Sequence, residues 1–454
     1  LIDSDNFADE DYFKLSQEYI AKLISPKYDI ISPSFAKPTY NFSYLSNNII
    51  TKNMIPFSPP RVDDKICDEV VAVLKSGWIT TGHKTKLFEK KISEYCGIQN
   101  TLCLNSATAG LEIMLRWFGV GPGDEVILPA YTYSATANVI VHCGATPVFV
   151  DVCANDFNIN HIEIEKVISS KTKVIMPVDF AGFPCDYEEI NSLAKKYSSI
   201  FIANCENQKM LGRILILSDS AHSFGASYNQ SKAGSLTDVS VFSFHAVKNL
   251  TTAEGGAVAL NLPLPFNNTD IYSKLCISTL HGQNKDALAK TQKGNWKYDI
   301  VEAGYKCNMT DISAAIGLVE LERYDNDTLI KRKSIIYNYQ KAFEMDDRIE
   351  LPLIETKNKT SCYHLYPLRI KGITEQQRDL IIQEIFNADV SVNVHFIPVP
   401  ATSFYKSMGY DLLNYPVTYV NFSREISLPV FYDLTPEQQN TVINAVKNAV
   451  NSIL

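Results

Sequence analysis

The sequence has no run of apolar residues long enough to cross a membrane. A spanning helix needs about 20 consecutive apolar residues, and no uninterrupted run approaches that length. Positive charge is also scarce, because 42 Lys and Arg residues face 50 Asp and Glu residues and leave a formal charge of -8. Non-specific binding to nucleic acids depends on a basic surface that displaces phosphate counterions. We therefore expect neither a membrane nor a nucleic acid as a partner.

Paired or clustered cysteines are missing too. The ten cysteines are scattered, with no Cys-x-x-Cys pair and no grouping with histidine. This pattern is typical of reduced thiols in a cytosol and not of a disulfide framework or a zinc site. We therefore expect a cytoplasmic protein without a metal site.

Internal repeats and low-complexity tracts are absent, and 454 residues with 46% hydrophobic side chains allow a globular protein of two domains. Residues 1–54 stand apart as an N-terminal arm. Apolar residues there recur at helical spacing and are followed by the helix breakers Pro26, Pro33 and Pro38. The arm is expected to pack its amphipathic helix against the main domain or against a partner subunit. The residues that carry this pattern are Tyr12, Phe13, Leu15, Tyr19, Ile20, Leu23 and Ile24.

Short apolar runs alternate with helical patterns from residue 55 to about residue 260. Continuous Val, Ile and Leu runs between helices indicate a mostly parallel sheet that is covered on both faces, and ligands of such sheets bind at the carboxyl ends of the strands. From 321 to 454 mixed segments end in a helix that begins at Pro436, which suggests a smaller α/β domain. The fold class is therefore α/β, with a large domain at 55–320 and a small one at 321–454. The expected strands are 101–104, 126–128, 147–150, 173–178, 214–217 and 239–242, and the expected helices include 111–118, 135–140 and 311–318.

Lys248 and Asp219 are the residues from which the chemistry is inferred. Asp219 follows an apolar run, and Lys248 comes 29 positions later, after a second such run. An amine and a carboxylate at neighbouring strand ends fit pyridoxal phosphate (PLP), with the lysine in a Schiff base and the aspartate on the pyridine nitrogen, where it keeps the ring an electron sink. If each residue is considered alone, the ordinary interpretation of the lysine is a solvated surface residue, and that of the aspartate is a helix cap.

Hydroxyl groups and a helix start could hold the phosphate. The segment Ser106-Ala107-Thr108-Ala109-Gly110 opens a helix after a strand, where free backbone N–H groups favour anions. Ser243 lies five residues before Lys248, and a tight turn at 254–257 leads back toward the sheet. Tyr133 could stack on the ring. In isolation the helix start is only a capped helix, and the tyrosine is a core or rim residue.

Eight ordered motifs together resemble one known family. They are GWITTG (77–82), TAG (108–110), PAYTY (129–133), GFP (182–184), DSAH (219–222), FSFHAVKN (242–249), EGG (254–256) and GYKCNMTD (304–311). This order is similar to that of the DegT/DnrJ/EryC1/StrS family of sugar aminotransferases, which are fold-type I PLP enzymes. The resemblance covers residues 55–454.

The resemblance implies a role for each matching position. Lys248 would bind PLP and move the proton, Asp219 would hold the pyridine nitrogen, and His222 would reach the ring hydroxyl side. Asn308 would cross to the phosphate of a neighbouring subunit, so the resemblance implies a homodimer with shared active sites. His395-Phe396-Ile397-Pro398 resembles the substrate-side His-Tyr-x-Pro stretch of the family. The implied phosphate ligands are Thr108, Ala109 and Ser243, the ring wall is Tyr133, and the substrate-side residues are Trp78 and His395.

One segment departs from the family pattern. Residues 200–203 and 214–217 both look like strands, and residues 204–213 separate them. We expect a local insertion near the cofactor, which leaves the path of the chain into Asp219 open.

The resulting functional hypothesis is transamination of a nucleotide-linked keto-6-deoxysugar at C3 or C4, with glutamate as the implied amino donor. Two alternatives stay open at this point: a PLP-dependent nucleotide-sugar dehydratase and a PLP-binding regulatory protein without turnover. Dehydratases of the family that lack the lysine link carry histidine at this place, so Lys248 favours transamination.

Overall fold

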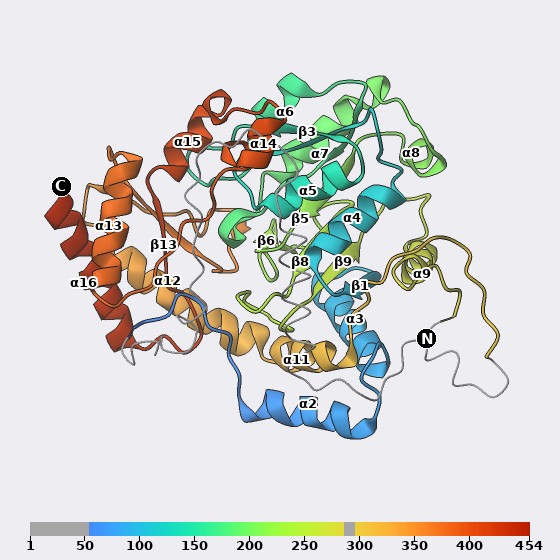
Figure 1. Cartoon of the computed structure of the whole chain (residues 1–454), viewed down its shortest axis with the longest axis horizontal. Coiled ribbons are helices and arrows are strands. Elements are labelled where there is room, and N and C mark those ends of the chain that lie inside the picture. Colours follow the sequence, from blue (N-terminus) through green and yellow to red (C-terminus); the bar gives the residue numbers. More distant parts are fainter. Residues whose placement is uncertain (1–53, 286–295) are drawn as a thin grey trace, which may run out of the picture. The chain divides into compact units, whose positions relative to one another are not determined.

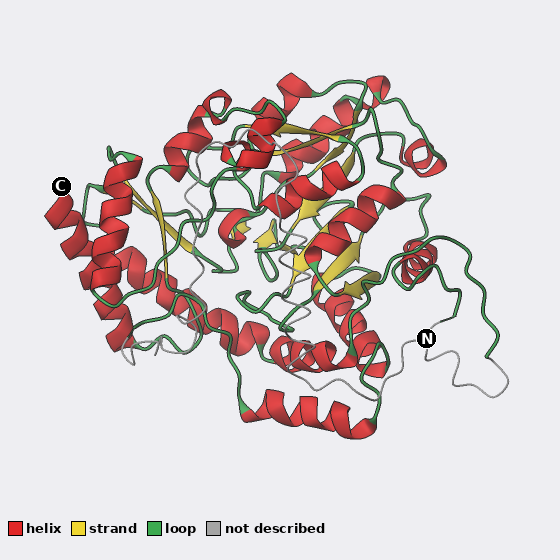
Figure 2. Ribbon diagram, in the orientation of Figure 1, coloured by secondary structure: helices red, strands yellow, loops and turns green. Residues whose placement is uncertain are grey.

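The computed structural model describes residues 54–285 and 296–454. The predicted N-terminal helix and arm lie outside these residues. The centre of the described part is a seven-stranded sheet with the order β1-β9-β8-β5-β4-β2-β3, and Figure 2 shows its strands among helices. The strands are β1 (Asn100–Leu104), β2 (Glu125–Pro129), β3 (Thr146–Val150), β4 (Thr172–Ile175), β5 (Leu215–Asp219), β8 (Val239–Ser243) and β9 (Gly256–Leu260).

The predicted α/β architecture with a mostly parallel sheet is confirmed. Strands β3, β2, β4, β5 and β8 pair in parallel, whereas β9 runs antiparallel to both β8 and β1. Alternate residues of β2 face different cores: Val126 and Leu128 belong to one hydrophobic cluster and Ile127 to another. Both faces of the sheet are therefore buried, as the continuous apolar runs predict.

Strand β9 is the one strand of this sheet that was not expected. The turn predicted at 254–257 leads directly into it, because Gly256 is its first residue. A Cβ atom at Gly256 would lie 2.4 Å from the backbone nitrogen of Ala107, so only glycine lets the start of β9 approach the start of α4 (Ala107–Trp117). The connection between β8 and β9 carries Lys248.

Helices surround the central sheet, and the C-terminal part of the chain adds further helices, among them α13 (Glu375–Asn387) and α16 (Pro436–Ile453) (Figure 1). The predicted helices after β1 and β2, the helix at 311–318 and the C-terminal helix are all present. The α-helices are α2 (Asp64–Ser76), α3 (His83–Cys96), α4 (Ala107–Trp117), α5 (Ser134–His142), α6 (His161–Val167), α7 (Tyr187–Lys196), α8 (Glu206–Leu211), α9 (Asn268–Ser278), α11 (Asp311–Glu322), α12 (Leu329–Phe343), α13 (Glu375–Asn387), α14 (Ser403–Ser407), α15 (Pro416–Phe422) and α16 (Pro436–Ile453).

A second sheet and core are built from the C-terminal part. Strands β10 (Ile349–Glu350), β12 (Tyr366–Ile370) and β13 (Glu425–Leu428) form an antiparallel sheet. Residues of α12, α13 and α16 pack with it in one hydrophobic cluster. A third small sheet, with the order β11-β6-β7, joins β11 (Lys359–Thr360) to β6 (Ser227–Tyr228) and β7 (Ser231–Lys232).

The predicted domain boundary near residue 320 falls in the last turn of α11. The division into two domains stays a prediction.

The expectations for residues 200–213 were wrong in two respects. Residues 200–203 form no strand, since Ile200 and Ile202 are exposed and only the segment from Leu215 pairs with β4. The insertion also does not lie near the cofactor residues. Asn204 donates from Nδ2 to Asp124 Oδ1 at 2.8 Å, and Asp124 precedes β2. Because parallel strands start at the same edge, this segment lies at the edge of the sheet opposite Asp219.

No helix among residues 54–285 and 296–454 is both long and apolar enough to cross a membrane. All ten cysteines lie in these residues, and none forms a disulfide.

Candidate active site

A cavity of about 450 Å³ opens where β5 and β8 end. Its walls come from the starts of α4 and α5, the loops after β5 and β8, and two C-terminal segments around residues 364 and 395. Strand ends far apart in sequence therefore meet at one edge, as expected for a parallel sheet. Seven of the ten predicted site residues line the cavity: Thr108, Tyr133, Asp219, His222, Ser243, Lys248 and His395.

Lys248 is positioned by the compact loop between β8 and β9. Its backbone N–H donates to the carbonyl oxygen of His245 at 2.9 Å, and Thr252 donates to Phe244 at 2.8 Å, which closes the loop. Burial lowers the pKa of Lys248 from 10.5 to about 8, although the nearby charge of Asp219 acts in the opposite direction. A neutral amine is therefore more accessible at neutral pH than for an ordinary lysine.

Asp219 is the last residue of β5, and its side chain is almost fully buried. Thr136 donates from Oγ1 to Asp219 Oδ2 at 2.8 Å, and the backbone of Ala221 donates to Oδ1 at 3.3 Å. No cation among the described residues lies within salt-bridge distance of this carboxylate. Burial raises the pKa of Asp219, while these two donors and Lys248 lower it. A protonated pyridine nitrogen would supply the missing donor.

His222 offers an unsatisfied polar atom. Its Nδ1 is buried and has no hydrogen-bond partner in the part of the chain that the structure describes. Its ring centroid lies 4.6 Å from that of His364 and 5.7 Å from that of Phe396. Burial and the charge of Lys248 hold its pKa well below the usual value, so the imidazole is neutral. Because buried polar atoms are rarely left without a partner, Nδ1 marks a place for a ligand atom.

The start of α4 provides the anion-binding end of the cavity. Ser106 caps the helix, and its Oγ accepts the N–H of Ala109 at 3.1 Å. The backbone N–H groups of Ala107 and Thr108 have no partner among the described residues, and the hydroxyls of Thr108 and Ser243 line the same space. Free N–H groups at a helix start attract phosphate.

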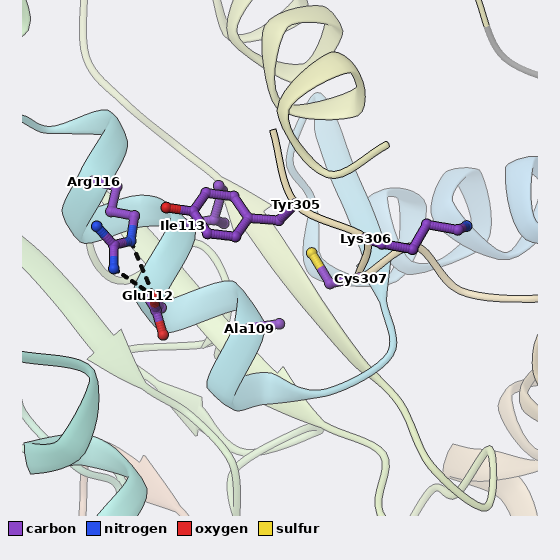
Figure 3. A pocket seen from close by; sticks show the side chains of 7 residues that line it. All are labelled: Ala109, Glu112, Ile113, Arg116, Tyr305, Lys306 and Cys307. Carbon is purple, nitrogen blue, oxygen red and sulfur yellow. Dashed lines mark hydrogen bonds and ion pairs between the residues drawn. The ribbon is translucent and has the colours of Figure 1, made fainter. Parts of the chain in front are cut away.

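Ala109 does not join this group. Its N–H is occupied by Ser106 Oγ, and its side chain lines a separate cavity of about 180 Å³ on the other side of α4. Figure 3 shows this second cavity, in which Glu112 and Arg116 form an ion pair near Tyr305. The helical turn that points Thr108 toward the main cavity turns the Ala109 side chain away from it.

Trp78 and Asn308 also lie outside the main cavity. Asn308 pairs with Leu104 beside the end of β1, and its Nδ2 donates to Thr81 Oγ1. Trp78 donates from Nε1 to the carbonyl oxygen of Thr81 at 3.1 Å. Both side chains therefore lie beside Thr81. Asn308 could take its predicted role only if the cavity of another subunit lay next to it, and Trp78 only if part of the substrate extended beyond the cavity.

The residues of the cavity fit PLP. An unpaired buried carboxylate, an amine with a lowered pKa, an unsatisfied imidazole nitrogen and a helix start with free N–H groups occur in one space. These are the four kinds of group that the pyridine nitrogen, the aldehyde, the ring hydroxyl and the phosphate of PLP require.

Comparison with known proteins agrees with this reading. The sequence model of the DegT/DnrJ/EryC1/StrS aminotransferase family matches residues 60–447. The chain belongs to this family. It is a PLP-dependent sugar aminotransferase with the fold of that group.

Three relatives show how far the similarity extends. The putative sugar aminotransferase Spr1654 from Streptococcus pneumoniae, in its PMP form, is 46% identical with a TM-score of 0.85, and the match covers 88% of this chain and 100% of that one. Its PLP form is 44% identical with a TM-score of 0.84. The uncharacterized protein MJ1066 of Methanocaldococcus jannaschii is 38% identical over 89% of this chain and 99% of that protein. The spore coat polysaccharide biosynthesis protein SpsC of Bacillus subtilis is 33% identical over 88% and 97%.

Four residues of the aminotransferase site had no role assigned from the sequence. Thr136 holds Asp219, and Phe396 adjoins His222. Asn249 Oδ1 accepts a hydrogen bond from His364 Nδ1 at 2.8 Å, and Asn249 Nδ2 donates to the carbonyl oxygen of Cys362 at 2.7 Å. Asn249 is the last residue of the motif at 242–249, and Thr136 comes three residues after the motif at 129–133, so both could have been found there. His364 carries no local signal, because only the chain path brings it to the cavity.

Proposed function

We propose that this aminotransferase moves the amino group of glutamate to the C3 or C4 ketone of a 6-deoxyhexose that is carried on a nucleoside diphosphate. The observation that carries this proposal is the meeting of Lys248 and Asp219 in one cavity at the carboxyl edge of the sheet. Membership of a sugar aminotransferase family supports the class of acceptor.

Proton transfer is the task of Lys248. PLP, when bound, supplies an electron sink for the bond that is broken at the amino-bearing carbon. Lys248 would take the proton from that carbon and deliver it to the aldehyde carbon of the cofactor, and in the second half of the reaction it would carry out the reverse transfer onto the sugar carbon. An amine with a pKa of about 8 suits this task, because general acid–base catalysis is most efficient when the pKa lies near the working pH.

Orientation is the task of the surrounding groups. Asp219 would keep a proton on the ring nitrogen through its buried carboxylate, and Thr136 donates to that carboxylate at 2.8 Å. The start of α4 with Thr108 and Ser243 anchors the phosphate. Tyr133 would stack on the cofactor ring, and Phe396, whose ring centroid lies 5.6 Å from that of Tyr133, lines the same cavity.

We further propose that the active enzyme is a homodimer. Both the amino donor and the nucleotide are anionic, yet no arginine lines the cavity among the described residues, and Lys248 is its one lysine. Asn308 stands outside its own cavity, where a residue that serves a neighbouring subunit would be placed. Light scattering of the purified protein should give twice the chain mass of 50.9 kDa. A monomer with full activity would exclude shared sites.

The pathway is also part of the proposal. The name of the relative SpsC refers to spore coat polysaccharide, and an amino sugar made in the cytoplasm for a surface polysaccharide fits the proposed chemistry.

The decisive experiment is a two-step assay with the PLP-loaded enzyme. Glutamate alone should release one equivalent of 2-oxoglutarate per active site, and adding a keto-sugar nucleotide should then give turnover and an amino sugar. A screen of such nucleotides with mass analysis of the products identifies the acceptor. A product that has lost water and gained no nitrogen, without 2-oxoglutarate, would establish the dehydratase alternative instead.

A further inference from the structure

A buried glutamate stands behind the substrate-side histidine. Glu425 begins β13 and is fully buried. No arginine or lysine of the described residues forms an ion pair with its carboxylate. Arg378 donates instead to the backbone carbonyls of Phe422 and Glu425, and Arg369 pairs with Glu350. Burying an ionised carboxyl without a cationic partner costs free energy. Such a residue therefore calls for an explanation.

Hydrogen bonds connect this carboxyl to the cavity. The backbone N–H of His395 donates to Glu425 Oε2 at 3.0 Å, and the hydroxyl of Ser427 donates to Glu425 Oε1. The same hydroxyl oxygen lies 2.9 Å from His395 Nδ1. The imidazole of His395 lines the cavity, and its Nε2 has no partner among the described residues. The three side chains therefore form a continuous chain from a buried site to the substrate space.

The electrostatics favour a proton on Glu425 over a second proton on His395. Burial and the charge of Lys248 lower the pKa of His395 to about 3, so a charged imidazolium is strongly disfavoured. Burial raises the pKa of Glu425 to about 8, against the lowering effects of Ser427, the His395 N–H, Arg378 and Arg369. The buried hydroxyl of Tyr131, which has no hydrogen-bond partner among residues 54–285 and 296–454, also interacts with the charge of Glu425, so that burial and this charge raise the pKa of Tyr131.

We propose that Glu425, Ser427 and His395 form a proton relay through which the neutral imidazole exchanges a proton with the bound sugar. When His395 Nε2 takes a proton, the proton on Nδ1 passes to Ser427 Oγ, and the hydroxyl proton of Ser427 passes to Glu425 Oε1. One proton enters, one carboxylate is neutralised, and no group is oxidised. In reverse, the relay delivers a proton to the ketone oxygen, which must leave as water. This use of the relay rests on the proposed function.

His395 is the residue of the relay that touches substrate, and Ser427 and Glu425 act as positioning residues through it. The relay has two states. With Glu425 ionised, His395 carries its proton on Nδ1 and presents a bare Nε2 as an acceptor. With Glu425 protonated, the hydrogen bonds reverse, and Nε2 carries a proton that it can donate.

Nitrogen NMR of the PLP-loaded enzyme with 15N-labelled histidine reads these states directly. The wild type should move the His395 proton from Nε2 to Nδ1 as the pH rises through about 8. In Glu425→Gln the amide oxygen accepts from the His395 N–H and the amide NH2 faces Ser427, so the Nε2–H form should persist at every pH. Ser427→Ala should remove the pH response. A His395 proton that stays on one nitrogen throughout in the wild type, or a Glu425→Gln variant that still switches, would overturn the relay.

Kinetics provide a second readout. Both variants should lower kcat by about 10-fold or more and leave KM close to wild type, because the relay affects proton transfer and not binding. Glu320→Gln is the matched control, since Glu320 is a buried glutamate that pairs with Arg323 away from the cavity; it should leave the His395 response unchanged. The NMR readout needs no turnover. If the His395 proton changes its position with pH but keto-sugar nucleotides are not aminated, the relay is supported and the proposed substrate is wrong.

Discussion

Lys248→Ala should lower kcat by at least about 10³-fold, which corresponds to the upper range of general acid–base effects. The substitution removes both the amine that holds the cofactor aldehyde and the base that moves the proton. The visible absorbance of the lysine-bound cofactor should disappear as well. Release of 2-oxoglutarate from glutamate and an absorbance spectrum measure the two effects.

Loss of the fold would not explain this result. Lys248 forms no ion pair among the described residues, and burial already disfavours its charged form. The thermal midpoint of the cofactor-free variant should therefore equal or exceed that of the wild type. Lys171→Ala, at an exposed lysine, is the matched control and should keep full activity. Full activity in Lys248→Ala would remove the lysine from the mechanism.

Asp219→Asn is expected to lower kcat by about 10³-fold. Two opposite unit charges about 4 Å apart interact by about 4 kcal/mol at an effective dielectric near 20, and each 1.36 kcal/mol corresponds to a tenfold change in rate. Without the carboxylate the ring nitrogen loses its proton, and the electron sink weakens. Single-turnover kinetics with glutamate measure this effect in the first half-reaction.

The stability of the same variant separates a catalytic role from a structural one. Burial raises the pKa of Asp219 because the ionised form loses hydration, so a neutral amide of the same shape should keep or raise the thermal midpoint of the cofactor-free protein. Thr136→Val, which removes the 2.8 Å hydrogen bond to Asp219, should reduce kcat by a smaller factor in the same direction. A sharp loss of stability in Asp219→Asn with unchanged kcat would make Asp219 a structural residue.

The parts of the site that follow from local sequence were predictable. Asp219 and Lys248 stand after apolar runs that form β5 and β8, and a parallel sheet brings such strand ends together. Thr108 stands at a helix start, and Ser106 caps that helix as its residue type favours. These features depend on a few neighbouring residues, so the pattern of types and spacings is sufficient.

The parts that depend on the path of the chain were not predictable. His364 and Glu425 reach the site from segments more than 100 positions from Lys248, and nothing in their neighbours marks them. Residues 200–203 have the apolar residues of a strand but lie outside the sheet, because the place beside β4 is taken by β5. Ala109 was assigned to the phosphate by its place in a motif, whereas the cap by Ser106 takes its N–H.

The central claim is a covalent link between PLP and Lys248, opposite Asp219. Reduction of the PLP-loaded enzyme with borohydride, followed by peptide mass spectrometry, tests it most directly. We predict a pyridoxyl group on Lys248 alone, lost when an excess of glutamate is added before the reductant. A pyridoxyl group on another lysine, or none on any, would contradict the account.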